Sequence, residues 1–294
     1  MNILEFASRK AQGQKISMIT CYDHWSARIV NQSDIDTILV GDSLAMVVHG
    51  YDSTVHATVP MMATHIAAVR RGAPDKFVIG DMPFLSVRKG LEPAMVAVGE
   101  LMQAGANCVK IEGARGQLDI MAHIVESGVP VMGHLGLTPQ SVEAFGGHKV
   151  QGKSEADAQQ ILADAKAIQD TGAFALVLEC VPQALAARIT AALDIPTIGI
   201  GAGASTDGQV LVMQDMLGMD SAFKPKFMRH YLQGEATLLG AFNEYHSQVA
   251  SAAFPSQAES YGAAPCLISG PDIAGSDGAG AGNDVSVNVE QLAG

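Results

Sequence analysis

The chain has 294 residues, of which 48% are hydrophobic and 16% are charged, and its formal net charge is −12. This acidic balance excludes nucleic acid as an expected partner, because proteins that bind phosphate backbones carry basic surfaces. No run of about 18 apolar residues is present to cross a bilayer, and the first residues lack the apolar core of a secretory signal. We therefore expect a cytoplasmic protein without a membrane partner. Charged residues fall well below their usual share of about 25%, so a monomer's surface would be poorly covered, which predicts a homo-oligomer.

Short apolar runs alternate with segments of helical spacing along most of the chain. Strands are predicted at residues 16–20, 37–40, 77–79, 108–111, 129–132, 175–178 and 197–200. Residues 209–213 are the best candidate for an eighth strand, although they also suit the start of a helix. Helices are predicted at residues 92–104, 118–126, 155–170 and 184–192. Strands that are apolar on both faces and alternate with helices indicate a parallel sheet covered on both sides.

Seven or eight such units within about 250 residues favour a closed (β/α)8 barrel, the TIM barrel, over an open doubly wound sheet. A dinucleotide-binding sheet would need G-x-G-x-x-G after the first strand, where Cys21-Tyr22-Asp23-His24 stands instead. We predict one catalytic domain over residues 1–255. Residues 256–294 are rich in Gly, Ala and Ser and contain no Lys or Arg, which predicts a flexible tail. A short helix docked on the barrel is the alternative.

Ionisable side chains occur at the ends of five predicted strands, where the ligands of parallel α/β proteins gather. They are Asp42, Asp81, Lys110, Glu112, His134 and Glu179. Side chains alternate between the two faces of a strand, so Lys110 and Glu112 point the same way. If Val109 and Ile111 face the helices, the charged pair faces the barrel axis.

A single Asp after a strand is more often a helix cap or turn residue than a ligand. Four carboxylates and a lysine at equivalent places weaken that explanation, because the carboxylates would repel one another unless a cation gathers them. The set is rich in oxygen and has no cysteine or histidine pair at metal spacing, which disfavours zinc. We therefore predict a Mg²⁺ site that Mn²⁺ can replace.

At these residues the sequence resembles the ketopantoate hydroxymethyltransferase (3-methyl-2-oxobutanoate hydroxymethyltransferase) family. The matching stretches include Leu39-Val40-Gly41-Asp42-Ser43, Gly80-Asp81-Met82-Pro83-Phe84, Val109-Lys110-Ile111-Glu112-Gly113, Gly133-His134-Leu135-Gly136-Leu137-Thr138-Pro139-Gln140 and Leu178-Glu179-Cys180-Val181-Pro182. The resemblance runs in order over residues 1–255. It departs from the family pattern at Val55-His56, where a Leu-Pro pair is usual.

The resemblance implies a (β/α)8 barrel that binds one Mg²⁺ per subunit. It assigns the metal to Asp42, Asp81 and Glu112, and the 2-oxo acid substrate to Asp42, Ser43, Asp81 and Lys110. It also implies a large homo-oligomer, such as a decamer.

The implied reaction transfers a hydroxymethyl group from 5,10-methylenetetrahydrofolate to 3-methyl-2-oxobutanoate, through a Mg²⁺-stabilised enolate. The product is 2-dehydropantoate, in pantothenate biosynthesis. Glu179 matches the proton acceptor of the family. For His134 we predict a role in substrate binding, with bracing of the site as the alternative.

Two other functions remain possible from the sequence. One is a Mg²⁺-dependent oxo-acid lyase or mutase of the isocitrate lyase and phosphoenolpyruvate mutase type, which also stabilises an enolate and has a Gly-Asp-Ser after an early strand. That group commonly uses a loop cysteine, which has no clear counterpart here. The other is a barrel that binds an oxo acid without catalysis, against which stands the energetic cost of burying charges that have no task.

Overall fold

A computed structural model of the chain describes residues 1–222 and 224–262. The chain divides into two compact units, residues 1–239 and 240–294. Of the predicted tail, residues 263–294 lie outside the described residues, and the preceding residues include a short 3-10 helix, Gln257–Glu259. The boundary at residue 255 stays a prediction.

The first unit is a closed barrel of eight parallel strands in sequence order, which confirms the predicted TIM barrel. The strands are β1 Ile16–Thr20, β2 Thr37–Val40, β3 Phe77–Asp81, β4 Cys108–Glu112, β5 Val131–Gly136, β6 Ala175–Glu179, β7 Thr197–Ile200 and β8 Gly208–Leu211. β8 pairs with both β7 and β1 and so closes the ring. The uncertain segment 209–213 contains both predicted structures, because β8 ends at Leu211 and a helix begins at Met213.

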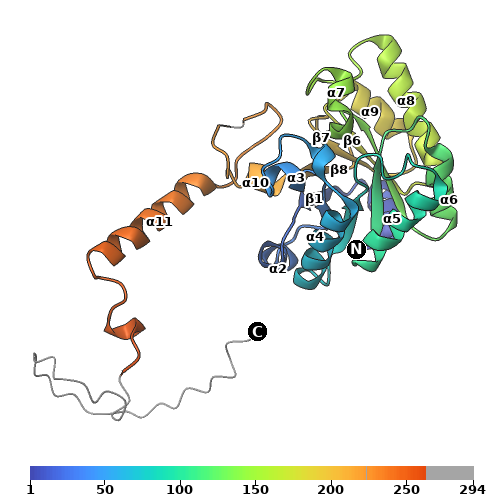
Figure 1. The fold of residues 1–294 in the computed structure, drawn as a ribbon. Coiled ribbons are helices and arrows are strands. Elements are labelled where there is room, and N and C mark those ends of the chain that lie inside the picture. Colours follow the sequence, from blue (N-terminus) through green and yellow to red (C-terminus); the bar gives the residue numbers. More distant parts are fainter. Residues whose placement is uncertain (223, 263–294) are drawn as a thin grey trace, which may run out of the picture. The chain divides into compact units, whose positions relative to one another are not determined.

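Helices lie around the ring of strands (Figure 1). They include α1 Ile3–Ala11, α2 His24–Gln32, α3 Leu44–Val47, α4 Val59–Gly72, α5 Leu91–Gln103, α6 Leu118–Glu126, α7 Val142–Phe145, α8 Glu155–Asp170, α9 Gln183–Ala192 and α10 Met213–Met216, with 3-10 turns η1 Thr54–His56 and η2 Pro139–Ser141. A further helix, α11 Gly234–Ala250, crosses the boundary between the two units. Several begin at side-chain caps, as at Asp23, Thr58 and Ser154, which satisfy backbone N–H groups of the first turn. Among the described residues, no helix is long and apolar enough to cross a membrane.

Two apolar clusters result from the alternation of side chains along the strands. Val109 and Ile111 belong to the outer cluster, between the strands and the helices. Cys108 belongs to the inner cluster, inside the barrel. Lys110 and Glu112 share the face of Cys108, so the predicted orientation of this charged pair is confirmed.

The amino-terminal end of the barrel is closed by three aromatic rings. Phe6 of α1 is fully buried, and its ring lies 5.5 Å from Phe77 and 5.2 Å from Phe174 in edge-to-face geometry. Such pairs add stability beyond their buried area. The carboxyl-terminal end is therefore the end left for a functional site.

Several strands are longer at their carboxyl ends than predicted. Asp81, Glu112 and Glu179 are the last residues of their strands, and His134 lies within β5. The ladder continues because the polar side chains do not interrupt backbone pairing: Asp81 pairs with Lys110, and Glu112 pairs with His134. The strand predicted at residues 129–132 starts later, at Val131, because Pro130 cannot donate to a ladder.

Candidate active site

Asp81 and Lys110 form a buried ion pair at the barrel mouth. Lys110 Nζ lies 2.7 Å from Asp81 Oδ1, and each side chain is 4% exposed. Burial lowers the pKa of Lys110, but the negative charges of Asp81, Glu112 and Asp42 outweigh it and raise the pKa above its ordinary value. Lys110 is therefore a fixed positive charge among carboxylates.

Asp42 follows β2 and lies beside this pair. Its backbone N–H donates to Asp81 Oδ2 at 3.0 Å, and its Oδ2 accepts from Gln140 Nε2 at 2.8 Å. Burial raises the pKa of Asp42 well above its usual value, and the negative charges of Glu112 and Asp81 raise it further. Asp42 is thus the carboxyl whose ionised form most needs another positive charge.

His134 lies between two glutamates. Its Nδ1 is 3.3 Å from Glu112 Oε1, and its Nε2 is 3.3 Å from Glu179 Oε2. Burial and Lys110 lower the pKa of His134, but its contacts with Glu112 and Glu179 outweigh them and raise the pKa to about 9. Lys110 Nζ also lies 3.2 Å from His134 Nδ1, where a neutral ring would accept from the lysine. We favour the cationic ring, because the surrounding carboxylates outnumber Lys110.

Glu112 accepts hydrogen bonds that keep it ionised. Besides the contact with His134, its Oε2 accepts from the backbone N–H of Gln140 at 3.1 Å. Burial raises the pKa of Glu112, but His134, Lys110 and Gln140 outweigh burial and lower it. The surroundings therefore raise the pKa of Asp42 and lower the pKa of Glu112.

Ser43 follows Asp42, and its hydroxyl lies 2.8 Å from the Tyr22 hydroxyl. Tyr22 follows β1 and is fully buried. The Ser43 side chain is thereby held at the end of β2 with a hydroxyl that can donate to a ligand.

The donor set suits Mg²⁺, although its ligands are not assembled. Among the described residues, no three acidic, histidine or cysteine side chains are placed to hold one metal ion together. Asp81 contacts Lys110, Asp42 accepts from Gln140, and Glu112 contacts His134. One observation nevertheless fits a hard cation: besides burial, repulsion from Glu112 and Asp81 raises the pKa of Asp42, and a cation would relieve that repulsion. The assignment of Asp42, Asp81 and Glu112 as ligands stays a prediction.

The structure brings Asp42, Asp81, Lys110, Glu112, His134 and Glu179 together, with Ser43 beside Asp42. Sequence reasoning missed Gln140, which joins Asp42 to the Met82 carbonyl at 2.9 Å and to Glu112 through its backbone. The one signal for Gln140 was its place at the end of the stretch 133–140.

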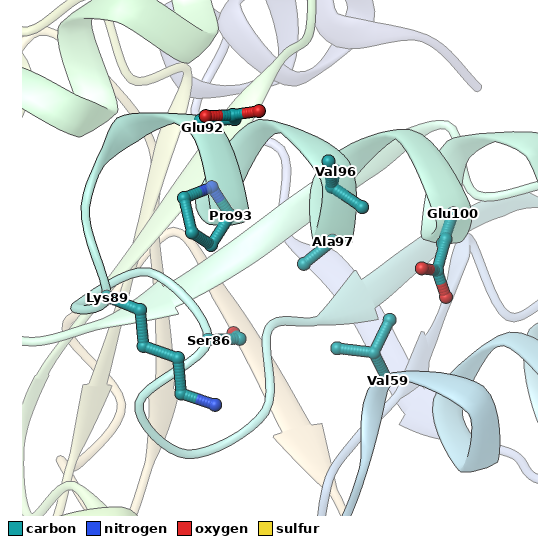
Figure 2. A pocket seen from close by; sticks show the side chains of 8 residues that line it. All are labelled: Val59, Ser86, Lys89, Glu92, Pro93, Val96, Ala97 and Glu100. Atoms are coloured by element: carbon teal, nitrogen blue, oxygen red, sulfur yellow. The ribbon is translucent and has the colours of Figure 1, made fainter.

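A separate surface pocket of ≈ 340 Å³, the α5 pocket, lies between α5, the loop before it and the start of α4 (Figure 2). Its lining residues are Val59, Ser86, Lys89, Glu92, Pro93, Val96, Ala97 and Glu100. None of the predicted site residues lines it.

A parallel eight-stranded barrel whose mouth buries a lysine, a histidine and several carboxylates has the architecture of a (β/α)8-barrel enzyme that acts on a small anion. Residues 1–257 match the model of the family described as ketopantoate hydroxymethyltransferase. The chain belongs to this family.

Curated relatives agree with that assignment. The chain is 61% identical to the 3-methyl-2-oxobutanoate hydroxymethyltransferase of Bdellovibrio bacteriovorus, over 88% of this chain and 98% of that one. It is 54% identical to the protein of the same name from Coxiella burnetii, over 87% of this chain and 96% of that one. The predicted enzyme class is confirmed.

Solved structures show the same fold at low identity. A phosphoenolpyruvate phosphomutase from Streptomyces platensis subsp. rosaceus superposes with a TM-score of 0.58 at 11% identity, over 86% of this chain and 88% of that one. A putative phosphonomutase from Burkholderia cenocepacia gives 0.57 at 18% identity, over 72% and 92% of the two chains. At these identities the likeness extends to the barrel alone, so the lyase or mutase alternative gains no support beyond the fold.

Proposed function

We propose that the protein transfers a hydroxymethyl group from 5,10-methylenetetrahydrofolate to 3-methyl-2-oxobutanoate. The products are 2-dehydropantoate and tetrahydrofolate, with water supplying the new hydroxyl group. The observation that carries the proposal is the buried positive charge of Lys110 among carboxylates. Glu179, which is more exposed, contacts the other side of His134. The names of the two relatives that are 61% and 54% identical support 3-methyl-2-oxobutanoate as the acceptor of the hydroxymethyl group.

The mouth of the barrel suits a small 2-oxo acid. The substrate carboxylate is attracted by Lys110 and accepts a hydrogen bond from the Ser43 hydroxyl. One Mg²⁺ per subunit, held by Asp42, Asp81 and Glu112, would supply Lewis acidity that polarises the keto group. Gln140 and the backbone N–H of Asp42 hold these carboxylates in place.

Glu179 is the proposed proton acceptor. Its side chain is 18% exposed, whereas those of His134 and Glu112 are 3% and 5% exposed. Of these side chains it is therefore the most accessible to a ligand at the mouth. Glu179 removes the proton from C3 of the acid, and the negative charge moves to the keto oxygen of the enolate, beside Lys110. His134 positions Glu179 by its charge.

The new carbon–carbon bond joins C3 of the acid to the methylene carbon of the carrier. Both bonds between that carbon and the N5 and N10 nitrogens of the carrier break: the bond to C3 replaces one, and a bond to the oxygen of water replaces the other. The two nitrogens of tetrahydrofolate take up the proton that Glu179 removed and one proton of the water. C3 of the product carries no hydrogen, so Glu179 cannot form a second enolate at that carbon.

We also propose that the protein acts in the cytoplasm, in pantothenate biosynthesis, as a homo-oligomer such as a decamer. The exposure of Trp25 and Ile29 on α2, 65% and 60%, supports association because these apolar side chains would gain by burial. Light scattering after gel filtration should give a mass several times that of one chain. A monomer would contradict the oligomer.

The direct test of the reaction follows 2-dehydropantoate in mixtures that contain the purified protein, 3-methyl-2-oxobutanoate and Mg²⁺. The product should form only when 5,10-methylenetetrahydrofolate is added. Product formation without the folate, or none with it, would contradict the proposed donor. A parallel assay for cleavage of a tricarboxylate should remain at background, because the lyase alternative requires the opposite result.

A further inference from the structure

Three hydroxyl groups form a connected series, the hydroxyl chain, between the start of α10 and the proposed active site. They belong to Thr20, Tyr22 and Ser43. The backbone N–H of Met213 donates to the Thr20 hydroxyl at 2.9 Å. The Tyr22 hydroxyl lies 2.8 Å from that of Ser43 and is also hydrogen-bonded to Thr20. Thr20 and Tyr22 are buried and Ser43 is partly exposed, so the chain begins in the interior and ends at the barrel mouth.

Ser43 stands at the N-cap position of α3 but its side chain does not cap the helix. A serine at that position usually accepts from a backbone N–H group of the first turn, whereas the Ser43 hydroxyl is hydrogen-bonded to Tyr22 instead. A Cβ atom placed at Gly41 would lie 2.9 Å from Ser43 Oγ and 3.4 Å from Asp81 Oδ2. The Ser43 hydroxyl therefore lies on the same side of the Gly41 backbone as the carboxylate of Asp81.

The direction of the hydroxyl chain follows from its interior end, because each hydroxyl has one proton to donate. A backbone N–H only donates, so Thr20 accepts from Met213 and keeps its own proton for another partner. Among the hydrogen bonds of the described residues, the one with Tyr22 is the bond through which Thr20 can donate. Tyr22 then donates to Ser43, whose own proton is left for a ligand. The reverse direction would leave the Thr20 proton buried without an acceptor, which is unfavourable.

Tyr22 keeps its proton and so remains a donor within the chain. Burial raises the pKa of its hydroxyl, and the negative charges of Asp81 and Asp215 contribute to the rise. The side-chain hydrogen bonds with Ser43 and Thr20 oppose the rise in pKa without cancelling it. The phenol is therefore neutral at any pH at which the enzyme is folded and its carboxylates are ionised.

We propose that Tyr22 is a positioning residue for the 2-oxo acid, which holds the proton of the Ser43 hydroxyl in the direction of the substrate carboxylate. This inference rests on the proposed function, in which that carboxylate accepts from Ser43. A carboxylate oxygen only accepts, just as the N–H of Met213 at the other end only donates. The bound acid thus completes a chain whose hydrogen bonds all run in one direction, and hydrogen bonds aligned in this way strengthen one another.

The role of Tyr22 predicts an effect on binding of the acid and little effect on the reaction of the bound acid. The substrate carboxylate takes no part in the bond changes at C3, so its contact with Ser43 is the same before and during the reaction. An interaction of this kind changes the KM and leaves kcat nearly unchanged. Without the phenol, the Ser43 hydroxyl is free to turn toward the carboxylate of Asp81, which competes with the substrate for its proton.

The test is a double-mutant cycle of Tyr22→Phe and Ser43→Ala. The Kd for 3-methyl-2-oxobutanoate is measured by calorimetry with Mg²⁺ and without folate, and the KM and kcat are measured by steady-state kinetics with both. We expect Tyr22→Phe to raise the Kd and the KM about fivefold, with kcat within about twofold. Ser43→Ala should raise the Kd about tenfold or more, because it removes a hydrogen bond to a charged group. Adding Tyr22→Phe to Ser43→Ala should change the Kd by less than about twofold.

Three further variants separate the hydroxyl chain from general damage to the fold. Thr20→Val removes the buried hydroxyl at the start of the chain and should raise the Kd about threefold, whereas Thr20→Ser keeps a hydroxyl and should leave the Kd unchanged. Should Tyr22→Phe fail to fold, equal Kd values for these two Thr20 variants would overturn the inference. Tyr51→Phe is the matched control and should bind the acid normally, because Tyr51 is 46% exposed and its ring stacks on His56.

The outcomes keep the role of Tyr22 apart from the proposed function. Equal affinity of Tyr22→Phe and the unsubstituted protein, with Ser43→Ala weakened, would overturn the role of Tyr22 and leave the proposed function standing. Full additivity of the two substitutions would do the same, because Tyr22 would then act independently of Ser43, as a purely structural residue does. An unchanged Kd in Ser43→Ala would overturn both the contact of Ser43 with the acid and the role of Tyr22. If the unsubstituted protein binds no acid, the proposed function fails together with the inference.

Discussion

The two ends of the barrel are made by the same eight strands but are held together by different forces. At the amino-terminal end, the ring of Phe6 packs edge-to-face against those of Phe77 and Phe174 within an apolar cluster. At the carboxyl-terminal end, Lys110 and Asp81 are 4% exposed and depend on each other's charge. Buried charges of this kind contribute less to stability than well-packed apolar groups. The comparison assigns stability to one end and chemistry to the other, as expected for this fold.

The largest effect is expected from Glu179→Gln at the carboxyl end. Amide nitrogen and oxygen cannot take the C3 proton, so exchange of that proton and product formation should both fall by a factor of about 10²–10⁴, the usual contribution of a general base. Affinity for Mg²⁺ should change less than twofold, because Glu179 is not a predicted ligand. Exchange is measured by NMR as loss of the C3 deuterium label. Survival of exchange at the original rate would show that another group is the base.

Phe6→Ala tests the other end. The substitution removes a fully buried ring and leaves a cavity, so the free energy of unfolding should fall by about 3–5 kcal/mol. The kcat of the folded fraction should remain within twofold, since Phe6 lies at the end of the barrel away from the site. Urea denaturation and kinetics at a low temperature measure the two quantities. A large loss of kcat with unchanged stability would contradict the assignment of Phe6 to stability alone.

Gln140→Leu tests the support of the carboxylates. The leucine keeps the backbone N–H that donates to Glu112 but removes the side-chain donor to Asp42. Loss of a group that orients a ligand commonly costs 10–100-fold in metal affinity, so we expect a rise in the Kd for Mg²⁺ of about tenfold. The control is Gln159→Leu on the exposed side of α8. If Gln140→Leu and Gln159→Leu bind Mg²⁺ with equal affinity, the Gln140 side chain does not orient a ligand of the metal.

The smallest effect concerns Asp215 on α10, at the same end of the barrel. Burial, and to a smaller extent the negative charge of Asp220, raise its pKa to about 6 against the opposing effect of His230. The folded state therefore binds this proton more tightly than the unfolded state, whose pKa is near 3.8, and this group makes stability fall as pH rises from about 4 to about 6. Asp215→Asn should stabilise the protein at pH 7 and have little effect at pH 4. Melting curves at the two pH values measure the difference. An equal shift at both would contradict the assignment.

The sequence predicted the barrel and the inward direction of its charged residues because both follow from local periodicity. Period-two alternation placed Lys110 and Glu112 on one face, and it needed no knowledge of neighbouring strands. α1 was not predicted, although Asn2 caps its first turn by accepting from the N–H groups of Leu4 and Glu5, a pattern that sequence rules recognise.

The contacts within the site could not be predicted in the same way. His134 meets Glu112 and Glu179 because β5 pairs with both β4 and β6 in one register, and a sequence does not state the register of parallel strands. Gln140 reaches Asp42 only through the path of a loop. Val55 and His56, where the family pattern is broken, lie in a turn in which His56 stacks on Tyr51 at 4.6 Å. Neither residue contacts the predicted site residues through a described hydrogen bond or ion pair.

The most direct measurement is a Mn²⁺ titration, followed by electron paramagnetic resonance, of the protein and of Asp81→Asn and Glu112→Gln, with Mg²⁺ as competitor. If oxygens from β2, β3 and β4 share one divalent ion, the unsubstituted protein will bind about one ion per chain. Each substitution should then weaken binding by on the order of 100-fold, somewhat more than is usual for a supporting residue. Unchanged binding in both variants would mean that these carboxylates hold no common ion, and the chemistry assigned to the barrel mouth would be wrong.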